Sequence, residues 1–149
     1  MATYRDNPYG AFNFIVVLGD GTESETVGGF SDCSGLGREV NYSEYRNGNE
    51  SFNTVRKIAN TYKTDDITLK RGLVGSLALF EWLKNVGNGE HDPRNVTVTL
   101  LDEARNSVAS WKLRDAQPKK WTGPTLAAKG GGEVAMEELS LVCEDCTYE

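Results

Sequence analysis

Short runs in which apolar and polar residues alternate recur along the chain, with the two-residue period that is typical of β-strands. Residues 12–18 carry apolar side chains in both alternating sets, which predicts a strand buried on both faces or nearly so. A Gly-Asp-Gly turn signal follows at residues 19–21, and residues 26–31 can return as the second strand of an N-terminal hairpin. The same alternation predicts further strands over residues 67–69, 95–101, 109–114 and 133–143.

A second predicted hairpin is long. Residues 38–46 place Val40 and Tyr42 on one face of a strand and polar side chains on the other, and residues 47–50 form a polar tip. Residues 54–62 can return as the second arm, with Ile58 and Tyr62 expected to share a face. An arm of about nine residues extends about 30 Å. Because a small barrel needs less than this, we expect the hairpin to reach beyond its own domain.

One segment has the period of a helix. Ser76 is the expected N-cap and Gly87 the expected C′ residue. Between them, four apolar residues recur at helical spacing: Leu79, Phe80, Leu83 and Val86. Residues 118–132 are predicted to form a loop, because they contain Gly123-Pro124 and three consecutive glycines.

Many short strands and one helix predict a mainly β fold, a small antiparallel β-barrel or sandwich with one packed α-helix. The 149 residues, 38% of them hydrophobic, are enough for one core and too few for two domains of ordinary size. We therefore expect a single domain over residues 1–149.

Charge and hydropathy exclude some classes of function. The formal net charge of -6 argues against a protein whose main task is to grip nucleic acid, because such binding needs Lys and Arg to neutralise phosphates. No run approaches the roughly 20 apolar residues that span a bilayer, and residues 1–10 lack the pattern of a secretory signal. We expect a protein made in the cytoplasm, without a signal peptide or a direct membrane anchor.

The cysteines do not form a recognisable metal or redox motif. Cys33, Cys143 and Cys146 are an odd number, which does not suit a closed disulfide framework. Cys143 and Cys146 have a spacing found in zinc sites, but a structural zinc needs four ligands and only His91 is left to help. We interpret all three as ordinary thiols and expect neither a metal nor a cofactor.

Candidate catalytic groups are equally isolated. His91 lies in a polar stretch without a local nucleophile or orienting partner, and the triple glycine before Glu133 lacks the Gly-Lys-Ser/Thr ending of a phosphate loop. The acidic pairs at residues 65–66 and 102–103 match no calcium loop. Trp121, after two lysines, is interpreted as an anchor in the core or in a subunit contact. The sequence therefore does not predict an enzyme.

Two blocks in this order resemble the tail tube protein family of contractile phages and of phage-derived contractile injection systems: Gly35 to Arg46 and Ile67 to Leu83. The resemblance continues through the strand around Phe12, the segment from Gly29 to Leu36, Trp121 to Pro124 and Glu133 to Glu137, and so spans nearly the whole chain.

The resemblance implies a ring-forming β-barrel flanked by a helix. In this family, homohexameric rings stack into a hollow tube, and each subunit gives four strands to a continuous inner barrel. The implied partners are other copies of the chain, a contractile sheath protein, baseplate or tube-initiating proteins, and a translocated cargo that is either a protein effector or DNA. The implied location is a phage-tail-like particle.

Roles for particular residues follow as hypotheses from the resemblance. In the strand over residues 38–46, Val40 and Tyr42 are expected to face the core, and Glu39, Asn41 and Ser43 the lumen of the tube. The candidate contact with the next ring is the hairpin tip, which consists of Asn47, Gly48, Asn49, Glu50, Ser51 and Phe52.

Other functions remain open at this point. A tube-initiating baseplate protein shares the fold but usually carries additional sequence, so a compact chain favours the tube itself. A monomeric ligand-binding β-barrel is a different class of protein, and it predicts a filled cavity and no assembly. An enzyme is the third and least supported reading.

Overall fold

The computed structural model describes residues 5–19, 29–130 and 133–149. Strands and one helix follow one another in this order: β1 (Phe14–Leu18), β2 (Asp32–Ser34), β3 (Arg38–Tyr45), β4 (Arg56–Thr64), β5 (Ile67–Gly72), α1 (Ala78–Gly87), β6 (Arg94–Leu101), β7 (Ser107–Thr122), β8 (Met136–Val142) and β9 (Asp145–Tyr148). The expected mainly β fold with one packed helix is confirmed.

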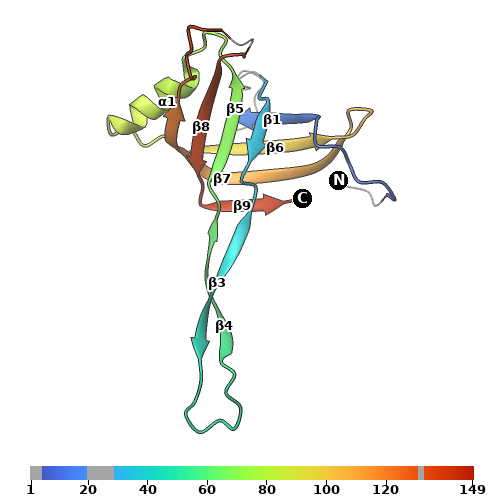
Figure 1. Cartoon of the computed structure of the whole chain (residues 1–149), viewed down its shortest axis with the longest axis vertical. Coiled ribbons are helices and arrows are strands. Elements are labelled where there is room, and N and C mark those ends of the chain that lie inside the picture. The colour runs from blue at the N-terminus through green and yellow to red at the C-terminus, as the bar shows by residue number, and fades with distance from the viewer. Residues whose placement is uncertain (1–4, 20–28, 131–132) are drawn as a thin grey trace.

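The long strand β7 joins two antiparallel layers (Figure 1). Its first part, up to Ala116, pairs with β6 and β9, and β6 pairs in turn with β1. Its last part, from Gln117, pairs with β8, and the order continues through β5 to β2. In the first layer, the edge strands are β1 and β9. In the second layer, the free edge is β2.

Two irregularities allow β7 to change layers. Asp115 has a positive φ of 52° at the register shift opposite Arg94 and Val96, and its N–H donates to Asn95 Oδ1 at 3.2 Å. A second shift follows Pro118. Proline is tolerated in sheets at such bulges, where no ladder hydrogen bond is needed from its nitrogen. The prediction that residues 118–132 form a loop is therefore wrong for residues 118–122, which are strand.

The core lies between the two layers and the helix. Strands contribute alternating buried side chains, and α1 contributes Leu79 and Trp82. The strand β1 is buried on one face only, because Ile15 is 43% exposed, so burial on both faces was overpredicted. In the described part of the chain, no helix is long and apolar enough to cross a membrane.

The ends of α1 differ from the prediction. The residue preceding the helix is Leu77, which makes no side-chain cap, although Ser76 Oγ accepts a 3.4 Å hydrogen bond from the N–H of Ala78. Gly87 is the last helical residue, and Gly89 supplies the positive φ of 97° after the end. The C′ residue is therefore Gly89, two residues later than the predicted Gly87.

The predicted N-terminal hairpin is wrong as far as the structure describes it. The strand β1 pairs with β6, almost 80 residues further along the chain, and not with a following strand. Residues 26–28 lie outside the described residues, and residues 29–31 are not strand. Strand β2, which begins after them, pairs with β5.

The expected long hairpin is the most prominent feature of the molecule. Among the described residues, strands β3 and β4 pair only with each other, and they extend away from the two layers along the longest axis (Figure 1). At its base, the guanidinium of Arg38 lies over the ring of Tyr62 and 3.5 Å from the carboxylate of Asp145 on β9. The hairpin therefore reaches beyond the core, as the length of its arms predicts.

Gly35 forms part of the junction between this hairpin and the core. Its φ is +86°, and a Cβ there would lie 2.1 Å from the carbonyl oxygen of Asp66. We expect Gly35→Ala to lower the free energy of unfolding by about 1–3 kcal/mol. The new methyl group would push the segment before β3, which contains Gly35, away from the segment after β4, which contains Asp66.

Urea denaturation of the two variants Gly35→Ala and Gly48→Ala checks this expectation. Gly48 is the matched control, because a Cβ at this position meets no atom within 4 Å and its φ is not positive. Equal unfolding free energies for the two variants would contradict the argument.

Candidate assembly surface

The register of the hairpin shows which side chains share a face. Partners in an antiparallel pair project to the same side of a ribbon. Val40 is opposite Tyr62, whereas Tyr42 is opposite Ala59, so β4 has one extra residue between these two pairs. Such a β-bulge reverses the alternation of the strand that contains it. One face therefore carries Val40, Tyr42 and Tyr62 together.

The bulge also corrects one sequence prediction. Ile58 is opposite Ser43, on the second face of the ribbon, whereas Tyr62 is on the first. The prediction that Ile58 and Tyr62 share a face is wrong, because strict alternation along β4 does not allow for the extra residue.

The three candidate lumen-facing residues lie together on the second face. Glu39, Asn41 and Ser43 are all exposed, and they extend along β3 at every second position. Lys63 Nζ lies 3.3 Å from the Glu39 carboxylate, and Asn60 Nδ2 donates to Ser43 Oγ at 2.8 Å. The structure therefore brings these residues onto one mostly polar face, and their role in a tube stays a prediction.

The first face does not pack on the core of its own chain. Val40 is 45% exposed and Tyr42 is 60% exposed. The expectation that they turn toward the core is wrong, because the hairpin leaves the core at its base (Figure 1). A two-stranded ribbon is marginal in water by itself. Its exposed apolar side chains and two open edges are typical of a surface that a partner covers.

The tip of the hairpin is organised by Arg46. Its Nε donates to the carbonyl oxygen of Phe52 at 3.1 Å, and its Nη2 donates to the carbonyl of Glu50 at 3.2 Å and to Asn53 Oδ1 at 3.1 Å. Arg56 forms an ion pair of 3.0 Å with Glu50. These bonds hold the backbone in one conformation, and they leave the Phe52 ring 76% exposed at the end of the molecule.

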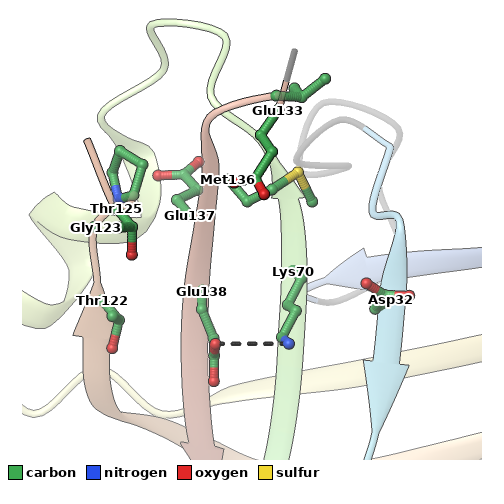
Figure 2. A pocket seen from close by; sticks show the side chains of 11 residues that line it. Asp32, Lys70, Thr122, Gly123, Thr125, Glu133, Met136, Glu137 and Glu138 are labelled. Carbon is green, nitrogen blue, oxygen red and sulfur yellow. Dashed lines mark ion pairs between the residues drawn. The ribbon is translucent and has the colours of Figure 1, made fainter. Parts of the chain in front are cut away.

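An acidic pocket of about 380 Å³, shown in Figure 2, lies where β7 ends and β8 begins. Figure 1 shows the start of β8 toward the end of the molecule opposite the hairpin tip. Four carboxylates line it: Asp32, Glu133, Glu137 and Glu138. Lys70 also lines it, and its Nζ lies 3.9 Å from Glu138, the pair drawn with a dashed line in Figure 2. The remaining lining comes from the end of β7, the start of β8 and the loops between them.

An apolar pocket of about 450 Å³ adjoins the acidic pocket, because Glu137 lines both. Leu73, Leu77, Phe80 and Trp121 provide most of its surface. The rings of Phe80 and Trp121 meet edge to face at 5.3 Å between centroids. We call the two pockets together the end surface.

A buried ion pair supports the end surface, and sequence reasoning missed it. Arg71 and Glu137 are 3% and 2% exposed, and Arg71 Nε donates to Glu137 Oε1. The second carboxylate oxygen accepts from Trp121 Nε1 at 3.2 Å, and Arg71 Nη2 donates to the carbonyl of Ser76 at 3.5 Å. Opposite charges at partnered positions of β5 and β8 were the available signal, but the sequence alone does not pair these strands.

Some of the candidate chemical groups lie near one another, since Cys143 interacts electrostatically with Cys146 and with Asp66. The thiols of Cys33, Cys143 and Cys146 are free, and burial raises the pKa of Cys33 and of Cys143 to about 11. His91 is exposed, and Asp66 pairs with Lys119 at 2.7 Å. In residues 5–19, 29–130 and 133–149, no three metal-ligating side chains are grouped to hold an ion. Trp121 is an anchor at the core boundary, as expected.

Comparisons with known proteins agree with this architecture. The family model described as T4-like virus tail tube protein gp19 matches residues 10–147. No curated protein matches the chain.

Several solved structures share the fold. One is a chain of the sheath–tube complex of PVC, an extracellular contractile injection system, in its extended state. It is 25% identical with a TM-score of 0.84, and the similarity covers 97% of this chain and 93% of that one. A chain of the anti-feeding prophage cap, which terminates the tube of the anti-feeding prophage, is 26% identical with a TM-score of 0.85. The similarity covers 100% of this chain and 95% of that one.

A more distant structure shares the fold alone. Hcp1 from Flavobacterium johnsoniae is 13% identical with a TM-score of 0.57, over 91% of this chain and 93% of that one. The family model matches nearly the whole of this chain. This chain in turn covers at least 93% of each of the three similar chains. The chain therefore belongs to the family of the T4-like virus tail tube protein gp19 and is a structural tube subunit.

Proposed function

We propose that this protein forms homohexameric rings that stack into the hollow inner tube of a contractile injection system or a contractile phage tail. The observation that carries the proposal is the β3–β4 hairpin, which projects beyond the core with apolar side chains exposed on both faces. In a ring, the open edges of such a ribbon become joints between subunits instead of sites of aggregation. The family match supports the same reading.

The proposed partners are those of the similar structures. The PVC structure is a complex of a sheath with a tube, and the structure from the anti-feeding prophage is a cap that terminates its tube. We infer that this chain likewise assembles with a contractile sheath, with a terminator and with a baseplate that starts the tube. A protein effector or DNA is the inferred cargo. The subunit is made in the cytoplasm and becomes part of a phage-tail-like particle.

Within the tube, the two faces of the hairpin have different roles in this proposal. The polar face with Glu39, Asn41 and Ser43 lines the lumen, where acidic and amide groups let a negatively charged cargo slide without binding. The apolar face with Val40 and Tyr42 packs on the neighbouring subunit. The tip, residues 47–52, contacts the next ring. The role is mechanical: the tube is a passive conduit, and the work comes from contraction of the sheath.

A tube initiator is the related alternative. The similarity to a chain of the PVC sheath–tube complex, with a TM-score of 0.84 over 93% of that chain, supports the tube subunit.

Native mass spectrometry of the purified protein tests the ring. Six copies of 16.4 kDa predict a species of about 98 kDa. The ligand-binding alternative instead uses the pocket of about 550 Å³ that Phe14, Cys33 and Trp111 help to line, and it predicts a 16.4 kDa monomer at every concentration. That monomer, with a small molecule bound, would overturn the proposal.

A further inference from the structure

An asparagine followed by a glycine occurs at two places in the chain, and the two lie in different surroundings. Asn47-Gly48 lies in the hairpin tip, and Asn88-Gly89 lies directly after α1. Asparagine is a chemically labile residue. A following glycine adds to this, because its backbone nitrogen has no neighbouring side chain to shield it and can attack the side-chain amide before it. The two positions therefore expose the same chemistry to two local structures.

The attacking nitrogen is held at one position and not at the other. The N–H of Gly89 donates to the carbonyl oxygen of Val86 at 3.1 Å, among the bonds that end the helix. Within the described residues, the N–H of Gly48 has no acceptor at hydrogen-bond distance, and a Cβ there would meet no atom within 4 Å. Because a bonded N–H must first be released before its nitrogen can attack, the hairpin tip is the more reactive place.

The backbone before Gly48 is only lightly held. The N–H of Glu50 donates to the carbonyl oxygen of Asn47 at 3.2 Å. The three bonds of Arg46 go instead to residues 50, 52 and 53, on the other side of the tip. Formation of a ring between Asn47 and Gly48 needs rotation about the bonds of Asn47, and the Arg46 contacts do not oppose it.

Tyr45 supplies an activating group. Its hydroxyl donates a hydrogen bond to Oδ1 of Asn47. Negative charge develops on this oxygen when a nucleophile attacks Cγ, and a donor placed there stabilises the charge, as in the oxyanion holes of enzymes. The tip therefore combines an accessible nucleophile with a polarised amide.

We propose that Asn47 is a site of spontaneous deamidation that Tyr45 activates. The nitrogen of Gly48 forms a bond to Cγ of Asn47, the proton of that N–H passes to the departing amide nitrogen, and ammonia leaves to give a cyclic succinimide. Solvent water then opens the ring at one of its two carbonyls, which leaves aspartate or isoaspartate at position 47. No oxidation or reduction takes place.

The products change the hairpin tip. Both place a new carboxylate in the turn that Glu50 closes, and isoaspartate also lengthens the backbone by a methylene group. In the proposed tube the next ring covers the tip, so the reaction acts on subunits before assembly and lowers the fraction that can stack. This consequence rests on the proposed function, whereas the modification itself does not.

Peptide mapping by mass spectrometry tests the site. The purified protein is aged in neutral buffer, folded or in urea, and the modified fraction at Asn47 and Asn88 is followed with time. We expect Asn47 to react several-fold faster than Asn88 in the folded protein, and the two rates to be similar in urea, where the Gly89 N–H is released. Equal rates in the folded protein, or the same difference in urea, overturn the proposal.

Tyr45→Phe tests the activating group. It removes the hydroxyl and keeps the ring, so we expect deamidation of Asn47 to slow several-fold while that of Asn88 stays the same. Tyr148→Phe is the matched control, because it makes the same change at an exposed tyrosine on β9. An Asn47 rate that Tyr45→Phe leaves unaltered overturns the activation by Tyr45.

Gly48→Ala separates the modification from its consequence. The new Cβ shields the attacking nitrogen and meets no atom within 4 Å. We expect the tube yield of Gly48→Ala to be the same before and after ageing, whereas the yield of the unaltered protein falls. Unaltered protein that is modified at Asn47 and still assembles fully overturns the consequence for stacking. Failure of fresh unaltered protein to form rings or tubes counts against the proposed function and not against the modification.

Discussion

Replacing residues 47–52 with a short Gly-Ser turn is expected to abolish stacked tubes while the subunit stays folded and still forms rings. The tip makes no contribution to the described core, so its loss leaves the two layers intact. In the proposed ring contact, however, each junction loses the burial of the Phe52 side chain, which is worth roughly 1.5–3 kcal/mol for a side chain of this size. Because the contact is repeated six times around a ring, the total loss is large.

Negative-stain electron microscopy and circular dichroism measure the two halves of this expectation. The matched control replaces Glu103, Ala104 and Arg105, in the turn between β6 and β7, with Gly-Ser-Gly. This turn is exposed but lies away from both ends of the long axis (Figure 1), so the control should form tubes. Tubes of normal length from the tip variant would show that the tip does not join rings.

Glu137→Ala is expected to lower the free energy of unfolding by about 3–5 kcal/mol. It leaves the guanidinium of Arg71 buried without its carboxylate and takes away the acceptor of the Trp121 N–H. A loss of this size is a large fraction of the stability of an ordinary domain. The end surface should also loosen, because both of its pockets are lined by Glu137.

Urea denaturation of the isolated subunit measures the effect. Glu138→Ala is the matched control on the same strand, because Glu138 is partly exposed and its pair with Lys70 is long at 3.9 Å, so we expect a loss below about 1 kcal/mol. The double variant Arg71→Met with Glu137→Leu should recover most of the stability, because apolar residues of similar size remove the uncompensated charge. Equal losses for Glu137→Ala and Glu138→Ala would contradict this account.

Local patterns in the sequence predict the elements of this fold better than their pairing. Alternation locates β3, β4, β6 and the first half of β7, and the helical period locates α1, because each pattern lies within one short segment. The length of the hairpin arms also predicts its reach beyond the core. By contrast, β1 pairs with β6 across nearly 80 residues, and no local pattern contains that information.

Irregularities account for most of the errors. The bulge in β4 moves Tyr62 and Ile58 to different faces, and one extra residue is invisible to a two-residue period. Pro118 reads as a loop residue, yet a second bulge admits it to β7. The end surface could not be predicted at all, because Glu137 looks like one more surface carboxylate until β8 pairs with β5 and brings Arg71 beside it.

Electron microscopy of the purified protein across a concentration series tests the central claim most directly, with and without the baseplate proteins that start assembly. A tube subunit predicts six-fold rings that stack into hollow tubes as the concentration rises or once a baseplate is present. A particle that stays monomeric under both conditions would contradict the account.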